Sequence, residues 1–405
     1  MVALTPTGKQ SLDALVAKAV EDKKIPGFVF GATSVDEEIY FNAGGNHIVD
    51  DPSSAPVTED TVFWICSQTK LLTHLAALQL IERGKLAEED PVVDYLPQMA
   101  NPVIVEDEMA DNLVYKPAQN VIRVKHLLNF TSGTFYPFKD ATLDNQLEAY
   151  ATLHPKDDHI TGFFNVVKGT LPGVPLRFEP GTNFAYGWSS DILGFVIEKA
   201  SGQRLDDYLK ENIFNPLGMK PSFHLTPELK AKLLPITYRR DGKLERWANQ
   251  GRLIEQDPSK VTAHLGGVGV YSSLKDYLNL LRHLLQILAG KATNPILKLE
   301  AVQSIFVPTL PEAGSKSLEL FLSMFPHVPK GTYSWGNALA LNTSAVEGGR
   351  SNGTGFWSGW ASTFHLIDPT KGVAVVFGTQ LLPAMDAEIL KASLDFENAL
   401  YAALE

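Results

Sequence analysis

Ser67-Gln-Thr-Lys70, followed by the apolar run of residues 71–81, is the segment from which the architecture of this chain can be worked out. The run is apolar nearly all round, which predicts a buried helix, and Gly84 is placed to end it. Serine and lysine three positions apart lie on the same face of a helix, so the amine can reach the hydroxyl. A lysine shielded from water can accept the serine proton, and the positive end of the helix dipole favours the resulting alkoxide. The pattern predicts a serine nucleophile with a lysine base, although a cap serine and a surface lysine would give the same spacing.

Both ends of the chain carry helix and strand patterns that fit together. Apolar residues recur at helical spacing over 12–20, and a final helix carries an apolar face that begins at Ile389. Strand-like runs lie at 28–34, 38–42, 363–368 and 372–378. Because short hairpins cannot bury a face alone, we expect the two ends to share one antiparallel sheet.

The middle of the chain is mostly helical, with Pro-containing loops between its helices. The fold class that we predict is α+β, with two lobes because a single core usually divides at this length. Residues 1–75 and 260–405 would form an α/β lobe, a central antiparallel sheet flanked by helices. Residues 76–259 would form an inserted, mainly helical lobe, and the active site would lie between the two.

Composition excludes some classes of partner. The chain has 405 residues, 44% of them hydrophobic, and a formal net charge of -11. This acidic balance argues against nucleic acid or an anionic membrane as partner. Cys66 is the single cysteine, so no intramolecular disulfide can form. The N-terminal residues do not resemble a secretory signal and no apolar run has membrane-spanning length, so we expect a cytoplasmic protein, with a processed N-terminus as the alternative.

Two aromatic motifs further along the chain supply the remaining parts of a hydrolytic site. Tyr186, in Phe-Ala-Tyr-Gly-Trp at 184–188, precedes a predicted helix and could carry a proton between the serine and a leaving group. Gly359, in Phe-Trp-Ser-Gly-Trp at 356–360, lies in a predicted strand, where glycine lets a ligand approach the backbone. An N–H group of this strand, together with the N–H of Ser67, would form an oxyanion hole.

The order Ser-x-x-Lys, then Tyr, then a Gly-containing strand resembles that of the serine β-lactamase and penicillin-binding protein superfamily. Three further stretches are similar to segments of that superfamily, and the resemblance covers residues 12–404. In one of them, Phe130-Thr-Ser-Gly replaces the His-Thr-Ser-Gly of the superfamily. The three stretches are 122–133, 213–219 and 265–273.

The resemblance implies a role for each motif residue. Ser67 would be the acyl-accepting nucleophile, with Lys70 and Tyr186 as its paired base. The N–H groups of Ser67 and Trp360 would form the oxyanion hole.

Two departures from the β-lactam-processing members bear on substrate. Those members carry Tyr-x-Asn, where this chain has Trp188 in the third place, and Lys-Thr-Gly on the late strand, where it has Trp357-Ser358-Gly359. That lysine helps to hold the carboxylate of a β-lactam or peptide, and an indole cannot replace it. Two tryptophans near the nucleophile indicate an apolar acyl or alcohol group instead. The chain is therefore most similar to family VIII carboxylesterases and to the fungal acyltransferases of statin biosynthesis.

Several side chains are expected to line the substrate pocket, and for the aromatic ones a place in the core is the alternative. His365, on the late strand, is explained equally well as a structural histidine. The predicted substrate-binding residues are Phe135, Trp188, Trp357, Ser358, Gly359 and His365.

These features predict a serine esterase that hydrolyses a small-molecule ester of apolar character through an acyl-enzyme on Ser67. The main alternative is an acyltransferase that passes the acyl group to an alcohol of a secondary metabolite. β-Lactamase activity and a non-catalytic binding protein are further alternatives. The sequence requires no metal and no organic cofactor.

Three other patterns imitate functional sites. Gly349-Arg-Ser351-Asn-Gly353 matches the Gly-x-Ser-x-Gly of α/β-hydrolases, but we interpret it as a loop because glycine and a strand follow it. Cys66 adjoins the nucleophile and is interpreted as a small buried residue. His154 and His159 match no defensible metal-ligand spacing and are assigned to a solvated loop.

Overall fold

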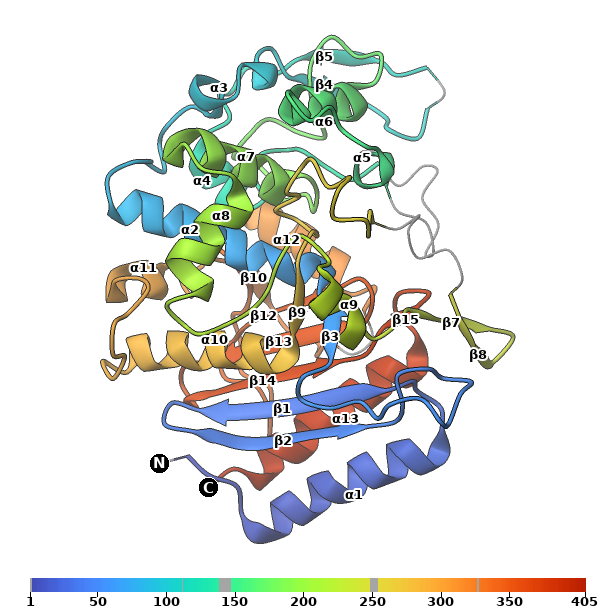
Figure 1. Ribbon diagram of the computed structural model, residues 1–405. Helices are drawn as coiled ribbons and strands as arrows, with labels where there is room; N and C mark the ends of the chain where they lie inside the picture. The colour runs from blue at the N-terminus through green and yellow to red at the C-terminus, as the bar shows by residue number, and fades with distance from the viewer. Residues whose placement is uncertain (1, 111, 138–146, 248–253, 326–327) are drawn as a thin grey trace.

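The computed structural model describes residues 2–110, 112–137, 147–247, 254–325 and 328–405. Its central element is a seven-stranded sheet in the order β10-β11-β12-β13-β14-β1-β2, in which every neighbouring pair is antiparallel (Figure 1). The strands are β1 (Phe28–Ser34), β2 (Glu38–Gly44), β10 (Tyr333–Trp335), β11 (Ala340–Asn342), β12 (Gly355–Gly359), β13 (Thr363–Asp368) and β14 (Val373–Gly378).

The two ends of the chain meet in this sheet, as the sequence predicts. β1 pairs with β14 over the register from Val29↔Gly378 to Ser34↔Val373. The terminal helices α1 (Pro6–Asp22) and α13 (Ala387–Ala403) pack against each other; in the view of Figure 1, α1 lies below the sheet and α13 passes behind β1 and β2. Both predicted hairpins are therefore confirmed, and so is the α+β fold.

The other face of the sheet leads to the helical part of the molecule. Helix α10 (Leu274–Leu288) packs on β1 and β14, and α2 (Thr69–Glu82) packs on α7 (Ser189–Ser201). Of the 14 residues of α2, twelve are buried, which agrees with a sequence that is apolar nearly all round. Gly84 follows α2 at φ +66°, and its N–H donates to the carbonyl of Ile81, as expected for a glycine that ends a helix.

Shorter elements complete the chain. The remaining strands are β3 (Val62–Trp64), β4 (Val103–Val105), β5 (Tyr115–Pro117), β6 (Pro175–Leu176), β7 (Thr237–Arg240), β8 (Lys243–Arg246), β9 (Tyr271–Ser273) and β15 (Leu381–Leu382). The remaining α-helices are α3 (Val92–Tyr95), α4 (Val124–Leu128), α5 (Glu148–Ala151), α6 (His159–Lys168), α8 (Leu205–Leu209), α9 (Pro227–Lys232), α11 (Leu299–Ser304) and α12 (Glu312–Leu322).

Figure 1 shows the terminal segments around the large sheet and the middle of the chain above it. The lobe boundaries at 75/76 and 259/260 remain a prediction. Across the described part of the chain, no helix combines the length and apolarity needed to cross a membrane.

Candidate active site

Ser67 lies in a tight turn between a strand and a helix. A 3₁₀ turn (Cys66–Gln68) joins β3 to α2, and Cys66 adopts a positive φ of +47°, which side chains other than glycine rarely take. The backbone before the turn is fixed from two sides: the N–H of Ile65 donates to the carbonyl of Val270, and the N–H of Trp64 donates to the Gln380 side chain. The turn presents Ser67 to a cavity while the residues beside it stay buried.

Lys70 is buried beside this serine. Its side chain is almost fully enclosed, at 1% exposure. The Lys70 Nζ donates to Ser67 Oγ (3.0 Å) and to the carbonyl oxygen of Gly267 (2.8 Å). It also lies 4.8 Å from the centre of the Tyr186 ring. The three-residue spacing thus places the amine against the hydroxyl, and the surface-lysine alternative does not apply.

A buried carboxylate holds Gly267, the residue whose carbonyl Lys70 contacts. Asp191 Oδ1 accepts from the N–H of Gly267 (2.8 Å), and Asp191 Oδ2 accepts from the Tyr150 hydroxyl (2.7 Å). Burial raises the pKa of Asp191 to about 6, against the opposing attraction of the Lys70 charge. Asp191 and Lys70 therefore hold the same residue from two sides: Asp191 accepts from the N–H of Gly267, and Lys70 donates to its carbonyl, which lies across the Cα in the next peptide group.

Tyr186 is held by its neighbours on both sides. A side chain at Gly187 would place a Cβ 2.4 Å from the Cα of Phe135, so glycine is needed for the chain to pass this closely. The Trp357 Nε1–H donates to the Tyr186 hydroxyl (3.1 Å), and the two ring centres lie 5.0 Å apart. Phe130, which stands where the superfamily has histidine, stacks on the Tyr186 ring at 5.6 Å.

The end of β12 approaches the nucleophile turn at Gly359. A Cβ at this position would lie 2.4 Å from the carbonyl oxygen of Ile65, which no side chain could tolerate. Ser67 and Trp360 both line the cavity on either side of this contact. The oxyanion hole predicted from their N–H groups remains a proposal, and the close approach at Gly359 supports it by bringing β12 against the nucleophile turn.

The cavity in front of Ser67 has a volume of about 140 Å³ and is lined mainly by apolar side chains. Phe321 and Trp357 contribute roughly parallel rings, 16° apart, whose centres are separated by 6.3 Å. Trp357, Ser358, Gly359 and His365 belong to its lining. That they bind substrate remains a prediction.

Trp188 and Phe135 lie elsewhere. Trp188 is the residue before α7 and is 2% exposed, and its ring packs edge-on against Tyr136 and Tyr150 at 4.8 and 5.1 Å. Phe135 is buried beneath the Arg177 guanidinium, 4.8 Å from the ring centre. For these two aromatics the core alternative describes the structure, because Gly187 draws the two segments together and closes the space between them.

His365 lines the cavity but is engaged on one side by the protein. Its Nδ1 lies 3.0 Å from the Gln68 amide nitrogen, and its ring packs on Tyr277 at 5.1 Å. Burial lowers the pKa of His365 to about 3, so the ring is neutral at ordinary pH. Its contacts support the structural interpretation.

The patterns that imitate functional sites have structural roles. Ser351 lies in a loop that leads directly into β12, and burial raises the pKa of the Cys66 thiol, which disfavours a reactive thiolate. His154 is buried and lies 2.8 Å from the carbonyl of Ala149, and His159 pairs with Glu198. The assignment of these two histidines to a solvated loop is therefore wrong: each packs against helix-borne groups.

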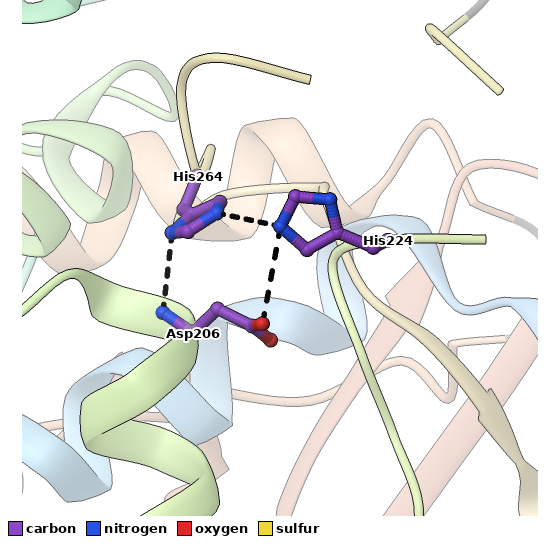
Figure 2. A group of neighbouring side chains, drawn as sticks. All are labelled: Asp206, His224 and His264. Carbon is purple, nitrogen blue, oxygen red and sulfur yellow. Dashed lines mark hydrogen bonds and ion pairs between the residues drawn. The ribbon is translucent and has the colours of Figure 1, made fainter. Parts of the chain in front are cut away.

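A second polar cluster lies outside the cavity. Figure 2 shows Asp206, His224 and His264 grouped between α8 and two loops. This donor set is of the kind that binds zinc. However, the N–H of Asp206 donates to His264 Nδ1 (3.3 Å), which places the hydrogen of that neutral ring on Nε2, facing His224 Nε2 at 3.1 Å. Lys210 also binds the Asp206 carboxylate (2.5 Å), so we interpret the cluster as a hydrogen-bonded bridge that anchors the segment leading to Gly267.

Comparison with known proteins assigns the chain to a family. Residues 12–398 match the family described as Beta-lactamase. The chain belongs to this family. The family's serine chemistry agrees with the arrangement of Ser67 and Lys70, and the protein is a β-lactamase-like serine hydrolase or a related acyltransferase.

Relatives in this family include both acyltransferases and esterases. The chain is 28% identical over 412 residues to the monacolin J acid methylbutanoyltransferase of Aspergillus terreus, covering 96% of this chain and 95% of that protein. It is 27% identical over 393 residues to the lovastatin esterase of Penicillium rubens, covering 94% of each. Among solved structures it resembles unliganded simvastatin synthase from Aspergillus terreus, with a TM-score of 0.81, 26% identity and 98% of each chain covered.

Sequence reasoning missed several residues that shape the site. In the sequence, Asp191 stands out only as the start of a helix, and Gly267 only as part of a family-like stretch. Phe321 comes from α12, far from any motif, and carries no local signal. Asp191 did carry a signal, because a carboxylate next to the apolar run of residues 192–197 requires a partner when that helix is buried.

Proposed function

We propose that this protein is a serine esterase that forms an acyl-enzyme on Ser67. The observation that carries the proposal is the hydrogen bond of 3.0 Å from Lys70 Nζ to Ser67 Oγ, made by two buried side chains at the wall of an apolar cavity. The family and the esterases among the relatives support the same assignment.

In the first half-reaction, Ser67 Oγ attacks the ester carbonyl carbon, and its proton passes to the Lys70–Tyr186 pair. The electron pair of the carbonyl moves onto its oxygen, which the N–H groups of Ser67 and Trp360 would stabilise. When the tetrahedral intermediate collapses, the bond to the alkoxy oxygen breaks and the alcohol leaves with a proton delivered through Tyr186. Water then repeats the sequence on the acyl-enzyme and releases the acid.

The substrate that suits this cavity is a small ester with an apolar group next to the reacting carbonyl. Phe321 and Trp357 offer ring surfaces to such a group. Trp357 also stands where the β-lactam-processing members carry a carboxylate-binding lysine, which disfavours β-lactam turnover.

A second candidate is acyl transfer to an alcohol, and the methylbutanoyltransferase among the relatives favours it. The chemistry up to the acyl-enzyme is the same, with an acceptor alcohol in place of water. Product analysis with and without added alcohol separates the two functions. Transfer that outruns hydrolysis at low alcohol concentration would establish the acyltransferase and overturn the esterase.

The experiment that tests the proposal is intact-mass measurement of the protein mixed with p-nitrophenyl butyrate, wild type beside Ser67→Ala. We expect a transient butyryl adduct and release of nitrophenol in the wild type, both lost in the variant. Activity that survives in Ser67→Ala would place the nucleophile elsewhere and overturn the proposal.

A further inference from the structure

The cavity that begins at Ser67 continues past the nucleophile. Trp357 on β12 faces the Ser67 side of the sheet, and its strand neighbour Phe356 points to the opposite side, since successive side chains alternate. Phe356 nevertheless lines the same cavity, together with Leu390 and Ser393 of α13. The cavity therefore passes the end of β12 and extends into the space between the sheet and α13.

A buried ion pair closes this second part of the cavity. Arg350 Nε and Nη2 donate to the two carboxylate oxygens of Glu397 on α13, at 2.6 and 2.8 Å. Both residues line the cavity, at 5% and 8% exposure. The Arg350 guanidinium carbon lies 4.7 Å from the centre of the Phe356 ring, which covers one face of the group.

One donor of this pair is unused. Arg350 Nη1 is buried and makes no hydrogen bond with any residue that the structure describes. A buried N–H group of a charged side chain that lacks an acceptor is costly, and buried polar groups in proteins are nearly always satisfied. Nη1 itself has almost no accessible surface, and it is other atoms of Arg350 that line the cavity, whose walls are largely apolar. A ligand group that satisfied Nη1 from the cavity would therefore have to cross an apolar passage and displace the atoms that cover this donor.

We propose that the cavity selects an acyl chain that is apolar along its length and ends in a neutral hydrogen-bond acceptor, a hydroxyl or keto oxygen, which accepts from Arg350 Nη1. This proposal rests on the proposed function, because the acyl group is the part of the ester that stays bonded to Ser67. A neutral acceptor fits better than a carboxylate, since Glu397 already balances the Arg350 charge and would repel a second anion.

The test compares unbranched p-nitrophenyl butyrate, hexanoate, octanoate and decanoate with the same esters bearing a terminal hydroxyl, using wild-type protein. We expect the hydroxyl to lower kcat/KM for short chains, where it would end among apolar side chains. At the length that reaches Arg350, we expect it to raise kcat/KM about tenfold, the effect of one hydrogen bond to a charged buried donor.

Two variants locate the effect. In Arg350→Met/Glu397→Met both charges are replaced together, which avoids an unpaired buried ion. We expect this variant to prefer the unsubstituted ester at every chain length. Ser393→Leu fills the passage beside α13 and should lower kcat/KM for long chains relative to butyrate, whereas Asn398→Leu on the exposed side of the same helix should leave the chain-length profile unchanged.

The outcomes separate this proposal from the proposed function. If the hydroxyl never raises kcat/KM while the unsubstituted esters are hydrolysed with an adduct on Ser67, the acceptor site is overturned and the esterase stands. If the preference persists in Arg350→Met/Glu397→Met, the donor is another group and the proposal is overturned. If no ester of either series acylates Ser67, the proposed function itself fails.

Discussion

The surroundings of the nucleophile and the walls of the cavity lie within one site, yet their polar groups differ in how many hydrogen-bond partners they have. Around Ser67, the Lys70 amine has two acceptors and the Asp191 carboxylate has two donors, all within 3.0 Å. Along the cavity the side chains are mostly apolar, and Arg350 Nη1 is buried without a hydrogen-bond partner among the described residues.

The difference indicates which region is already held in place by hydrogen bonds before substrate binds. The hydrogen bonds of Lys70 and Asp191 hold these groups in one arrangement, as required of groups that must transfer a proton. A wall of apolar side chains and a spare donor gains contacts only when a ligand supplies them. We therefore expect changes near Ser67 to lower kcat and changes in the cavity walls to alter substrate preference.

The largest effect is expected for Lys70→Met. The change removes the amine that contacts Ser67 Oγ and replaces it with a side chain of similar length. Loss of one member of a nucleophile–base unit removes most of its contribution, so kcat/KM for p-nitrophenyl butyrate should fall by about 10⁴-fold. Lys85→Met, an exposed lysine just beyond the same helix, serves as the control and should match the wild type. Retained activity in Lys70→Met would exclude the amine as a base.

Asp191→Asn tests whether the polar network positions Lys70. Asparagine keeps the size of the side chain but is a weaker, neutral acceptor for the Gly267 N–H and places an amide donor against Tyr150 or Gly267, so Gly267 should be held less firmly. We expect kcat to fall by about 10-fold to 100-fold with little change in KM. Tyr150→Phe removes the other bond to Asp191, together with the contact between the Tyr150 and Tyr136 hydroxyls, but keeps the bond to Gly267 and should cost much less. An equal loss in both variants would point to general damage of the core.

Asp191→Asn should also change how the free energy of unfolding depends on pH. The pKa of Asp191 is raised from 3.8 to about 6 by burial, so between these pH values the folded protein binds more protons at this group than the unfolded chain. The contribution of Asp191 to the free energy of unfolding therefore falls as pH rises from 3.8 to about 6, and levels off above that. Chemical denaturation over this range should show wild type losing stability relative to Asp191→Asn. Parallel curves for the two proteins would contradict the raised pKa.

In the cavity, Phe321→Ala should act on preference and not on chemistry. The lost ring removes apolar surface from the wall opposite Trp357. We expect kcat/KM for p-nitrophenyl hexanoate to fall about 10-fold relative to the acetate ester, in line with the apolar area lost. Met324→Ala, three residues further along and 57% exposed, is the matched control. A uniform fall on both esters would place Phe321 among the groups that support catalysis.

The sequence predicts the parts of this fold that depend on local patterns. Strand alternation and turn residues located β1, β2, β13 and β14 within a residue or two, and the requirement to bury each hairpin joined them into one sheet. The order of β10 to β12 beyond them could not be predicted, since short strands such as Tyr333–Trp335 carry too few residues for a periodic signal.

The residues of the candidate site also fall into those that a local pattern predicts and those that depend on distant contacts. The contact between Ser67 and Lys70 could be predicted because a spacing of three residues in a helical turn fixes it, and Tyr186 is proposed because its motif is matched in a family. Trp188 was misplaced because burial depends on which segment packs against it, here the one that passes Gly187. Arg350 pairs with a residue 47 positions away, a contact that the chain's local pattern does not indicate.

Ser351→Ala should give the smallest effect, although this serine lies in a hydrolase-like motif and directly follows Arg350. Its backbone N–H donates to the Asp368 carboxylate, a bond that alanine retains. Since the loop leads into a strand and not into a helix, Ser351 lacks the nucleophile elbow that would activate it. Activity on p-nitrophenyl butyrate should stay within about twofold of wild type. A loss comparable to that of Ser67→Ala would mean that the nucleophile lies at the far end of the cavity, and the contrast between the two regions would be reversed.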